Sequence, residues 1–241
     1  MAEVSLRRLT PAAAGVILGT IGGDLENKYE DRYRQPGYYW GRTPSSSCYR
    51  VLQLLPPDRP LRLLDIGCGE GRNAVFFARN GYQVTAFDAS ATGIEKTRKM
   101  AAEAGVPIEA FVADINEYRL EAEFDILFST GVLQYVPPEA RPGLFADYRD
   151  HKSPNGLNVF SVFVKKPFIP RAPDSETAAH KWISGELFSH YQDWKIEYCT
   201  EEIFDCMSSG IPHKHAIDRI VARNPAQAPG RAGATQPSPD Q

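Results

Sequence analysis

The residues that decide the fold are 63–71, which read LLDIGCGEG. A short apolar run leads into Asp65, and glycines then follow at alternate positions. This pattern is typical of a buried strand ending in a tight turn where the backbone lies against a ligand, because glycine has no side chain in the way. Asp65 and Glu70 disfavour a phosphate, since phosphate-binding turns present backbone N–H groups and usually a lysine. The turn favours a ligand that carries positive charge beside an adenosine.

Strand-like and helix-like segments alternate along the chain. Strands are expected at residues 62–66, 83–88, 108–112, 124–129 and 157–164, and helices at residues 72–80, 91–104 and 138–148. A short helix at residues 185–191 precedes two closing strands, 194–199 and 215–222, with no long helix between them. The alternation predicts an α/β fold, a doubly wound Rossmann-like sheet. The sheet is expected to be mostly parallel, with a C-terminal hairpin that adds an antiparallel strand.

Three acids, Asp65, Asp88 and Asp114, fall at or just after the ends of three successive predicted strands. Parallel sheets bind ligands at the carboxyl ends of their strands, near the point where the strand order reverses. We therefore expect these acids to share one edge of the sheet. Taken alone, Asp88 also fits a helix-capping acid and Asp114 a loop acid.

A dinucleotide-binding dehydrogenase is the main rival for this pattern. Its fingerprint, Gly-x-Gly-x-x-Gly, requires a third glycine that allows close packing of helix and strand. Counted from Gly67, that position is Arg72, which is large and charged. An acid at Asp65 is also unusual before a turn that binds pyrophosphate, so the pattern disfavours an NAD-dependent oxidoreductase.

The order and spacing resemble the class I S-adenosylmethionine-dependent methyltransferases, whose first motif is similar to residues 65–71. The resemblance implies their seven-stranded fold and S-adenosyl-L-methionine as the cofactor. It implies that Asp65 orients the turn and the methionine part, that Asp88 accepts from the ribose hydroxyls and that Asp114 accepts from the adenine amino group. The other implied cofactor contacts are Gly67, Cys68, Gly69, Ala89, Ile115, Ser129, Thr130 and Trp40.

Residues 68–73, 124–133 and 185–194 further resemble the tellurite-resistance (TehB-like) methyltransferases, and the likeness covers about residues 27–223. It implies a small-molecule acceptor, with a thiol, selenol or metalloid favoured. Oxygen or nitrogen acceptors of a natural-product or quinone pathway are the alternative, and a non-catalytic cofactor-binding protein is a remote one. The chain departs from the family at residues 204–215, FDCMSSGIPHKH, near where that family places histidine and arginine residues thought to aid catalysis.

Candidate residues on the acceptor side come from both ends of the chain. Tyr39 belongs to an aromatic cluster within residues 29–40 that predicts either a lid over the cofactor or a cap on the core, and it is a candidate catalytic residue. His213 and His215 share a face if they lie on a strand, which makes them candidate proton acceptors or acceptor-orienting groups. With Cys206 as the one plausible cysteine nearby, they fall short of the usual structural zinc set, and no metal site is predicted.

Composition limits the remaining classes. The chain has 241 residues and a formal charge of −3, which favours a single domain and disfavours nucleic-acid or membrane partners. Four cysteines without a Cys-x-x-Cys pair predict reduced thiols in a cytoplasmic protein. We expect this protein to be a monomer or a homodimer. We expect an N-terminal arm or helix at residues 1–26, a methyltransferase domain at 27–223 with an aromatic lid or cap at 27–60, and a disordered tail at 224–241.

Overall fold

The structure is a computed structural model that describes residues 23–173, 179–207 and 210–225. These residues form a seven-stranded sheet in the order β3-β2-β1-β4-β5-β7-β6. The first five strands pair in parallel, and β7 runs antiparallel to both of its neighbours. The strands are β1 (Arg62–Ile66), β2 (Gln83–Asp88), β3 (Glu109–Val112), β4 (Phe124–Thr130), β5 (Lys152–Val164), β6 (Lys195–Cys206) and β7 (His213–Arg223).

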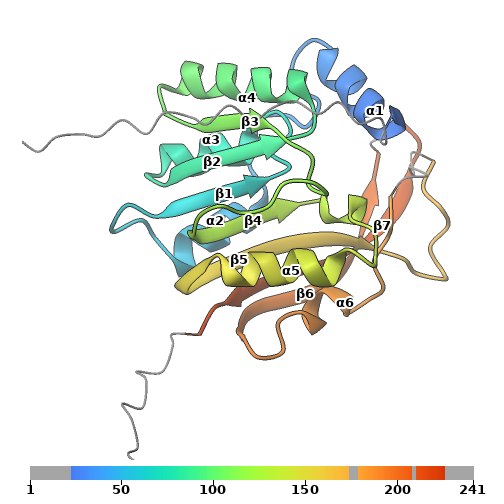
Figure 1. Cartoon of the computed structure of the whole chain (residues 1–241). Helices are drawn as coiled ribbons and strands as arrows, with labels where there is room; N and C mark the ends of the chain where they lie inside the picture. Colours follow the sequence, from blue (N-terminus) through green and yellow to red (C-terminus); the bar gives the residue numbers. More distant parts are fainter. Residues whose placement is uncertain (1–22, 174–178, 208–209, 226–241) are drawn as a thin grey trace, which may run out of the picture.

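Helices cover both faces of this sheet, as Figure 1 shows. They are α1 (Gly23–Arg34), α2 (Ser46–Leu54), α3 (Arg72–Arg79), α4 (Ala91–Ala104), the short 3-10 helix η1 (Leu133–Tyr135), α5 (Arg141–Asp150) and α6 (Glu186–Ser189). Apolar residues of α2, α3 and α4 pack on one face, and those of α5 and α6 pack on the other. The predicted doubly wound α/β fold with a closing antiparallel hairpin is confirmed.

The bounds of several elements differ from expectation for physical reasons. β6 continues to Cys206, seven residues beyond the predicted end at residue 199, because an edge strand exposes one side and accepts a charged, alternating sequence. β5 begins at Lys152, five residues before the expected start at residue 157, and within this added segment Asn155 adopts a left-handed conformation with φ of 62°. α5 begins at Arg141 instead of residue 138, because η1 and the two prolines that follow it hold the chain out of a helix.

The N-terminal region holds two helices that the sequence pattern did not reveal, α1 and α2. α1 extends across the expected boundary between residues 26 and 27. Most of the expected arm lies outside the described residues, as does the expected tail from residue 226 onward. Asn224 belongs to the fold, because its backbone N–H donates to Gly156 and its side chain to Lys152. No helix in the described part of the chain is long and apolar enough to cross a membrane.

One edge of the sheet gathers the residues singled out above. The arrows of β1, β2 and β4 in Figure 1 point toward this edge, and α1 lies across it. The start of β7 reaches the same edge, because Ala216 of β7 pairs with Val164, the last residue of β5. These strand ends together form the carboxyl edge of the sheet.

Candidate functional site at the carboxyl edge

The glycine turn joins β1 to α3 and leaves no room for side chains at two positions. Gly67 and Gly69 both have positive φ, and a β-carbon on Gly67 would lie 2.3 Å from Val132. Any other residue at Gly67 would therefore clash as well as strain the backbone. The thiol of Cys68 points away from the edge toward Thr97 of α4, so only the backbone of Cys68 is placed to meet a ligand.

Asp65 is buried beside this turn, and one of its oxygens is unpaired. Its Oδ2 has no hydrogen-bond partner among the described residues. Burial, followed by the nearby charge of Asp88, raises the pKa of Asp65 to about 7. A buried carboxylate without a partner is costly, so the site is suited to a cationic or hydrogen-donating ligand group.

Asp88 ends β2 and holds the glycine turn in place. Its Oδ2 accepts from the backbone N–H of Gly69 at 2.8 Å, and its Oδ1 accepts from that of Ser90 at 2.9 Å. Burial raises the pKa of Asp88, and these two hydrogen bonds oppose the rise. A carboxylate has about four lone-pair positions, so both oxygens retain capacity for ribose hydroxyls. Ala89 follows as an exposed residue at the same strand end.

The third acid, Asp114, lies in the loop after β3. Its Oδ1 accepts from the backbone and side-chain nitrogens of Asn116 at 2.8 and 3.1 Å, which forms a local turn in an exposed position. Ile115 beside it is buried in the apolar core. The structure therefore gives Asp114 a turn-forming role of its own, while Ile115 supplies an apolar wall.

Ser129 and Thr130 end β4, next to the glycine turn. The Ser129 hydroxyl donates to the carbonyl of Ile66 at 3.0 Å, which ties β4 to β1 at the carboxyl edge. The Thr130 hydroxyl accepts from Asn73 of α3 at 3.4 Å. Both hydroxyls thus have partners, and Ser129 is fully buried, so its contribution is to the shape of the edge.

Two members of the aromatic cluster contact the glycine turn, and a third packs against one of them. Tyr33 of α1 is buried, and its hydroxyl lies 2.9 Å from where a β-carbon on Gly69 would be. Trp40 donates from its indole nitrogen to the Tyr33 hydroxyl at 3.1 Å, and from its backbone to Glu70 at 3.2 Å. Tyr39 is exposed and packs on Trp40 with its ring centroid 4.8 Å away. Tyr33 and Trp40 therefore contact the turn from outside, but only Tyr33 is buried, because Trp40 is as exposed as Tyr39, at 39% against 37%.

Sequence reasoning missed a second link between α1 and the edge. Glu30 accepts from the hydroxyl of Ser90 at 2.5 Å, and it also bonds the hydroxyl and backbone of Thr92, at the N-terminus of α4. Gly93, inside α4, was the one feature of the sequence that could have indicated close packing of α1 against α4. A glycine in a helix usually has a packing reason, and here the Tyr33 ring lies 3.1 Å from where a β-carbon would be.

His213 and His215 lie together on β7, as the spacing predicted. Their Nε2 atoms are 2.9 Å apart, and Cys206 pairs directly opposite His213 in the hairpin. Asp205 lies on the other face of the hairpin, where it pairs with Lys214 at 2.6 Å. The two imidazoles therefore share a cluster with the thiol and not with that acid.

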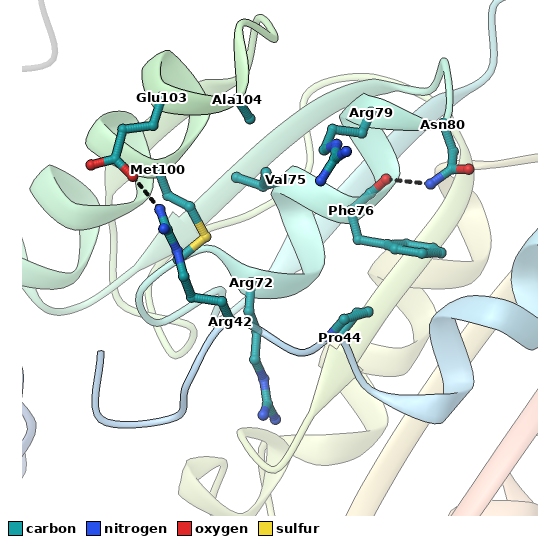
Figure 2. Close-up of a pocket in the computed structure, with 10 residues that line it drawn as sticks. All are labelled: Arg42, Pro44, Arg72, Val75, Phe76, Arg79, Asn80, Met100, Glu103 and Ala104. Atoms are coloured by element: carbon teal, nitrogen blue, oxygen red, sulfur yellow. Dashed lines mark hydrogen bonds and ion pairs between the residues drawn. The ribbon is translucent and has the colours of Figure 1, made fainter. Parts of the chain in front are cut away.

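A surface pocket of about 720 Å³ lies elsewhere, between α3 and α4. Figure 2 shows Arg42 reaching across it to Glu103, with Arg72 and Arg79 on the α3 side. None of the residues expected to bind the cofactor lines it. The glycine turn and this pocket are thus separate features of the molecule.

A seven-stranded sheet of this order, with a glycine turn after β1 and acids ending β1 and β2, defines the class I S-adenosylmethionine-dependent methyltransferase fold. The model of one family, described as tellurite resistance protein TehB, matches residues 30–209. The chain belongs to the TehB family.

Individual relatives agree with this membership. The chain is 33% identical over 157 residues to a protein named Hemagglutinin 1 from Eikenella corrodens, covering 65% of this chain and 50% of that one. It is 28% identical over 141 residues to a probable S-adenosyl-L-methionine-dependent methyltransferase TehB from Haemophilus influenzae, covering 58% and 48%. The crystal structure of TehB from Haemophilus influenzae superposes with a TM-score of 0.66 at 21% identity, covering 83% of this chain and 66% of that one. The chain spans about half the length of these two curated relatives.

Proposed function

We propose that the protein transfers a methyl group from S-adenosyl-L-methionine to a small-molecule acceptor. The observation that carries the proposal is the buried, unpaired Oδ2 of Asp65 beside a turn whose glycines admit no side chain. A cationic ligand lying on bare backbone would satisfy the carboxylate and explain the glycines. The residues at the carboxyl edge therefore fit this cofactor.

The proposed binding roles follow the strand ends. Asp65 would face the methionine part together with the backbone of Gly67 and Gly69. Asp88 would accept from the ribose hydroxyls with its remaining lone pairs. The loop at Asp114 and Ile115 would meet the adenine, with Ile115 as an apolar wall. Cys68 and Ala89 would contribute backbone, and Ser129 and Thr130 would shape the space near the sulfur.

When bound, S-adenosyl-L-methionine supplies a methyl group already activated by a cationic sulfur. The remaining task of the protein is to hold the acceptor in line and to exclude water. Tyr33 and Trp40 are placed for the second part, because they cover the glycine turn from α1 and the segment after it. Tyr39 remains a candidate for contact with the acceptor, and its exposure would require this segment to rearrange.

For the acceptor we favour a soft nucleophile, namely a thiol, a selenol or a metalloid. The tellurite-resistance description of the family supports this class. The cluster of Cys206, His213 and His215 at the same edge supports it too, because sulfur and imidazole groups are soft or borderline ligands. An oxygen acceptor is the second candidate. A ubiquinone biosynthesis O-methyltransferase from Rickettsia canadensis is 32% identical over 111 residues, covering 45% of this chain and 46% of that one.

Calorimetry tests the cofactor assignment directly. We expect S-adenosylmethionine and its demethylated product to bind, and NADH not to bind. Because Asp88 also holds two backbone N–H groups, Asp88→Asn is a gentler change than Asp88→Ala and should weaken cofactor binding at least about tenfold, or ~1.4 kcal/mol. Asp58→Asn, an exposed acid before β1, is the matched control and should bind normally. Absence of heat with the first two ligands would overturn the proposal.

An acceptor panel tests the finer assignment. Cofactor turnover is measured with thiols, selenite, tellurite, phenols and amines. We expect turnover with the soft nucleophiles and little with the amines. Phenol turnover above thiol turnover would instead favour the oxygen-acceptor alternative. His213→Ala and His215→Ala belong in the same assay, and unchanged rates for both would remove the two histidines from the mechanism.

A further inference from the structure

The paired ends of β6 and β7 bring together three side chains of the types that bind metal ions in proteins. Cys206 is the last residue of β6, and His213 and His215 lie on β7. Cys206 and His213 are directly opposite each other in the hairpin, so their side chains share a face, and His215 lies two residues further along it. The thiol sulfur and the imidazole nitrogens all lie within 4.8 Å of one another.

The orientation of the two imidazoles is that of a ligand pair. The Nε2 atoms of His213 and His215 are 2.9 Å apart, and the rings are nearly perpendicular, at 88°. Nδ1 of His213 lies 2.7 Å from the carbonyl of Ile211, so this nitrogen carries the proton and its Nε2 presents a lone pair. Metal-bound histidines are held in the same way, by donation from the other ring nitrogen to a carbonyl.

The separation of the two imidazole nitrogens is close to that of a tetrahedral site. With metal–nitrogen bonds of about 2.0–2.1 Å, two imidazole nitrogens of such a site lie about 3.3 Å apart. The two nitrogens lie 2.9 Å apart, so they need to move apart by only a few tenths of an ångström. Small rotations of the two histidine side chains provide this movement. All three residues are partly buried, so an ion could reach them from solvent.

The donor set determines the class of ion. One thiolate and two imidazoles select zinc and similar borderline or soft ions over magnesium or calcium, which prefer oxygen ligands. The nearest acid in sequence, Asp205, points to the other face and pairs with Lys214. The rings of Phe163 and Phe204 surround His215 at centroid distances of 5.0 and 5.7 Å. An apolar shell of this kind strengthens metal–ligand bonds by excluding water.

We propose that Cys206, His213 and His215 form a three-ligand site for a zinc-class divalent ion, with a fourth position for solvent or an exogenous ligand. Three protein ligands with one exchangeable position are the arrangement of catalytic zinc sites. The site lies near the cofactor edge, because the Phe163 ring contacts His215 and comes 3.6 Å from where a β-carbon on Gly131, after β4, would be. Figure 1 shows β7 reaching the edge of the sheet at which α1 lies.

The metal site does not depend on the identity of the acceptor. If the proposed function holds, a thiol acceptor bound at the fourth position would release its proton to solvent and be held as a thiolate, the nucleophilic form. The role of the metal in binding an acceptor rests on the proposed function, whereas metal binding itself does not, and the experiment separates these two claims. Metal binding is measured without cofactor, and cofactor binding is measured separately by calorimetry.

The test uses the full chain, expressed without a histidine tag and treated with a chelator before use. Iodoacetamide labelling, followed by mass spectrometry, compares the thiols with and without one equivalent of Zn²⁺. We expect Zn²⁺ to slow alkylation of Cys206 at least tenfold. Cys199, an exposed cysteine on the same strand, is the internal control and should react at an unchanged rate. Equal protection of both cysteines, or of neither, would overturn the proposal.

Cobalt provides the second readout. We expect one equivalent of Co²⁺ to give a thiolate-to-cobalt charge-transfer band that Zn²⁺ abolishes by displacement. Cys206→Ser should lose the band, His213→Gln should weaken Co²⁺ binding at least tenfold, and Cys199→Ser should retain both. A band that persists in Cys206→Ser would place the ion elsewhere and overturn the site. Circular dichroism and binding of the demethylated cofactor product check that each variant is folded. If a variant does not fold, the iodoacetamide labelling of the wild-type chain still tests the proposal.

Discussion

At the scale of single residues, Asp65 shows how a site can oppose the stability of its own fold. It is buried at the end of the apolar run of β1, and its Oδ2 lacks a hydrogen-bond partner among the described residues. The structure therefore favours its protonated form, and the pKa rises to about 7. A core residue selected only for packing would not be an acid here. The local cost is the mark of a position that serves a ligand.

The cost of burying the Asp65 carboxylate predicts that the stability of the cofactor-free protein depends on pH. The pKa of Asp65 is about 7 in the folded protein and about 4 when unfolded, so the folded state binds the proton more tightly. The free energy of unfolding should therefore fall as pH rises through this window, by about 2 kcal/mol between pH 5 and pH 7. Asp65→Asn should flatten the dependence, as measured by urea unfolding across that range. Asp58→Asn should keep the wild-type slope, and a parallel slope in Asp65→Asn would contradict the assignment.

Residues differ in how far the sequence revealed them. Asp65 and Asp88 were predictable because each lies at the carboxyl end of an apolar strand, and the ends of parallel strands meet at one edge. Glu30 was not, since it lies in an acidic and basic helix with no signal that it reaches Ser90 and Thr92. Asp114 was predicted as a cofactor contact, and that role stays a prediction beside the local turn which the residue forms.

At the scale of elements, α4 is fitted to the glycine turn at one position. Gly93 lies in its first turn, and a β-carbon there would be 2.8 Å from the carbonyl of Gly69 and 3.1 Å from the Tyr33 ring. The helix can approach the cofactor turn only because this residue has no side chain. Gly93 lowers the intrinsic stability of the helix but allows this close packing.

The prediction is that two glycine-to-alanine changes act with opposite signs. Gly93→Ala should lower the free energy of unfolding by at least about 1 kcal/mol, because backbone at Gly69 cannot give way as a flexible side chain would. Gly143→Ala in α5 meets no atom within 4 Å and should raise it by up to about 1 kcal/mol through helix propensity. Thermal or urea unfolding measures both. Stabilisation by Gly93→Ala would show that the contact is not tight.

Helices and strands were predictable where their own residues show a clear apolar pattern. β1, β2 and β4 are buried on both faces and appear as apolar runs, so their positions agree with expectation to within a residue. β6 was underestimated because it is an edge strand, and after residue 199 polar and charged residues interrupt the apolar pattern and most side chains stay partly or fully exposed. The helices α1 and α2 were missed because aromatic, acidic and basic residues in residues 23–54 obscure a helical apolar stripe.

At the scale of the whole molecule, the site joins segments far apart in the sequence. The glycine turn, the end of β2 and the helix α1 meet through Asp88, Ser90 and Glu30. A ligand that bridges these segments stabilises the whole fold, because it binds the folded state and not the unfolded chain.

We therefore expect the demethylated cofactor product to raise the melting temperature. At a hundred times its Kd it adds about 2.7 kcal/mol, which for a domain of this size corresponds to a shift of roughly 5–11 °C. Differential scanning fluorimetry measures the shift, with NADH at the same concentration as the control. Asp88→Asn should show a smaller shift at that fixed concentration. Equal shifts with the product and NADH would argue against a specific site.

The sequence by itself determined the fold class, the glycine turn and the acids at the strand ends, because these depend on local periodicity and on the rule that parallel strands expose their ends together. Only the tertiary structure decided what covers the turn and which groups meet at the far hairpin. Tyr33 reaches Gly69 across 36 residues of chain, and Cys206 joins His213 because of one particular hairpin register. A shift of one residue would have placed Asp205 there instead. Such contacts depend on how elements pack, and no segment of sequence carries that information alone.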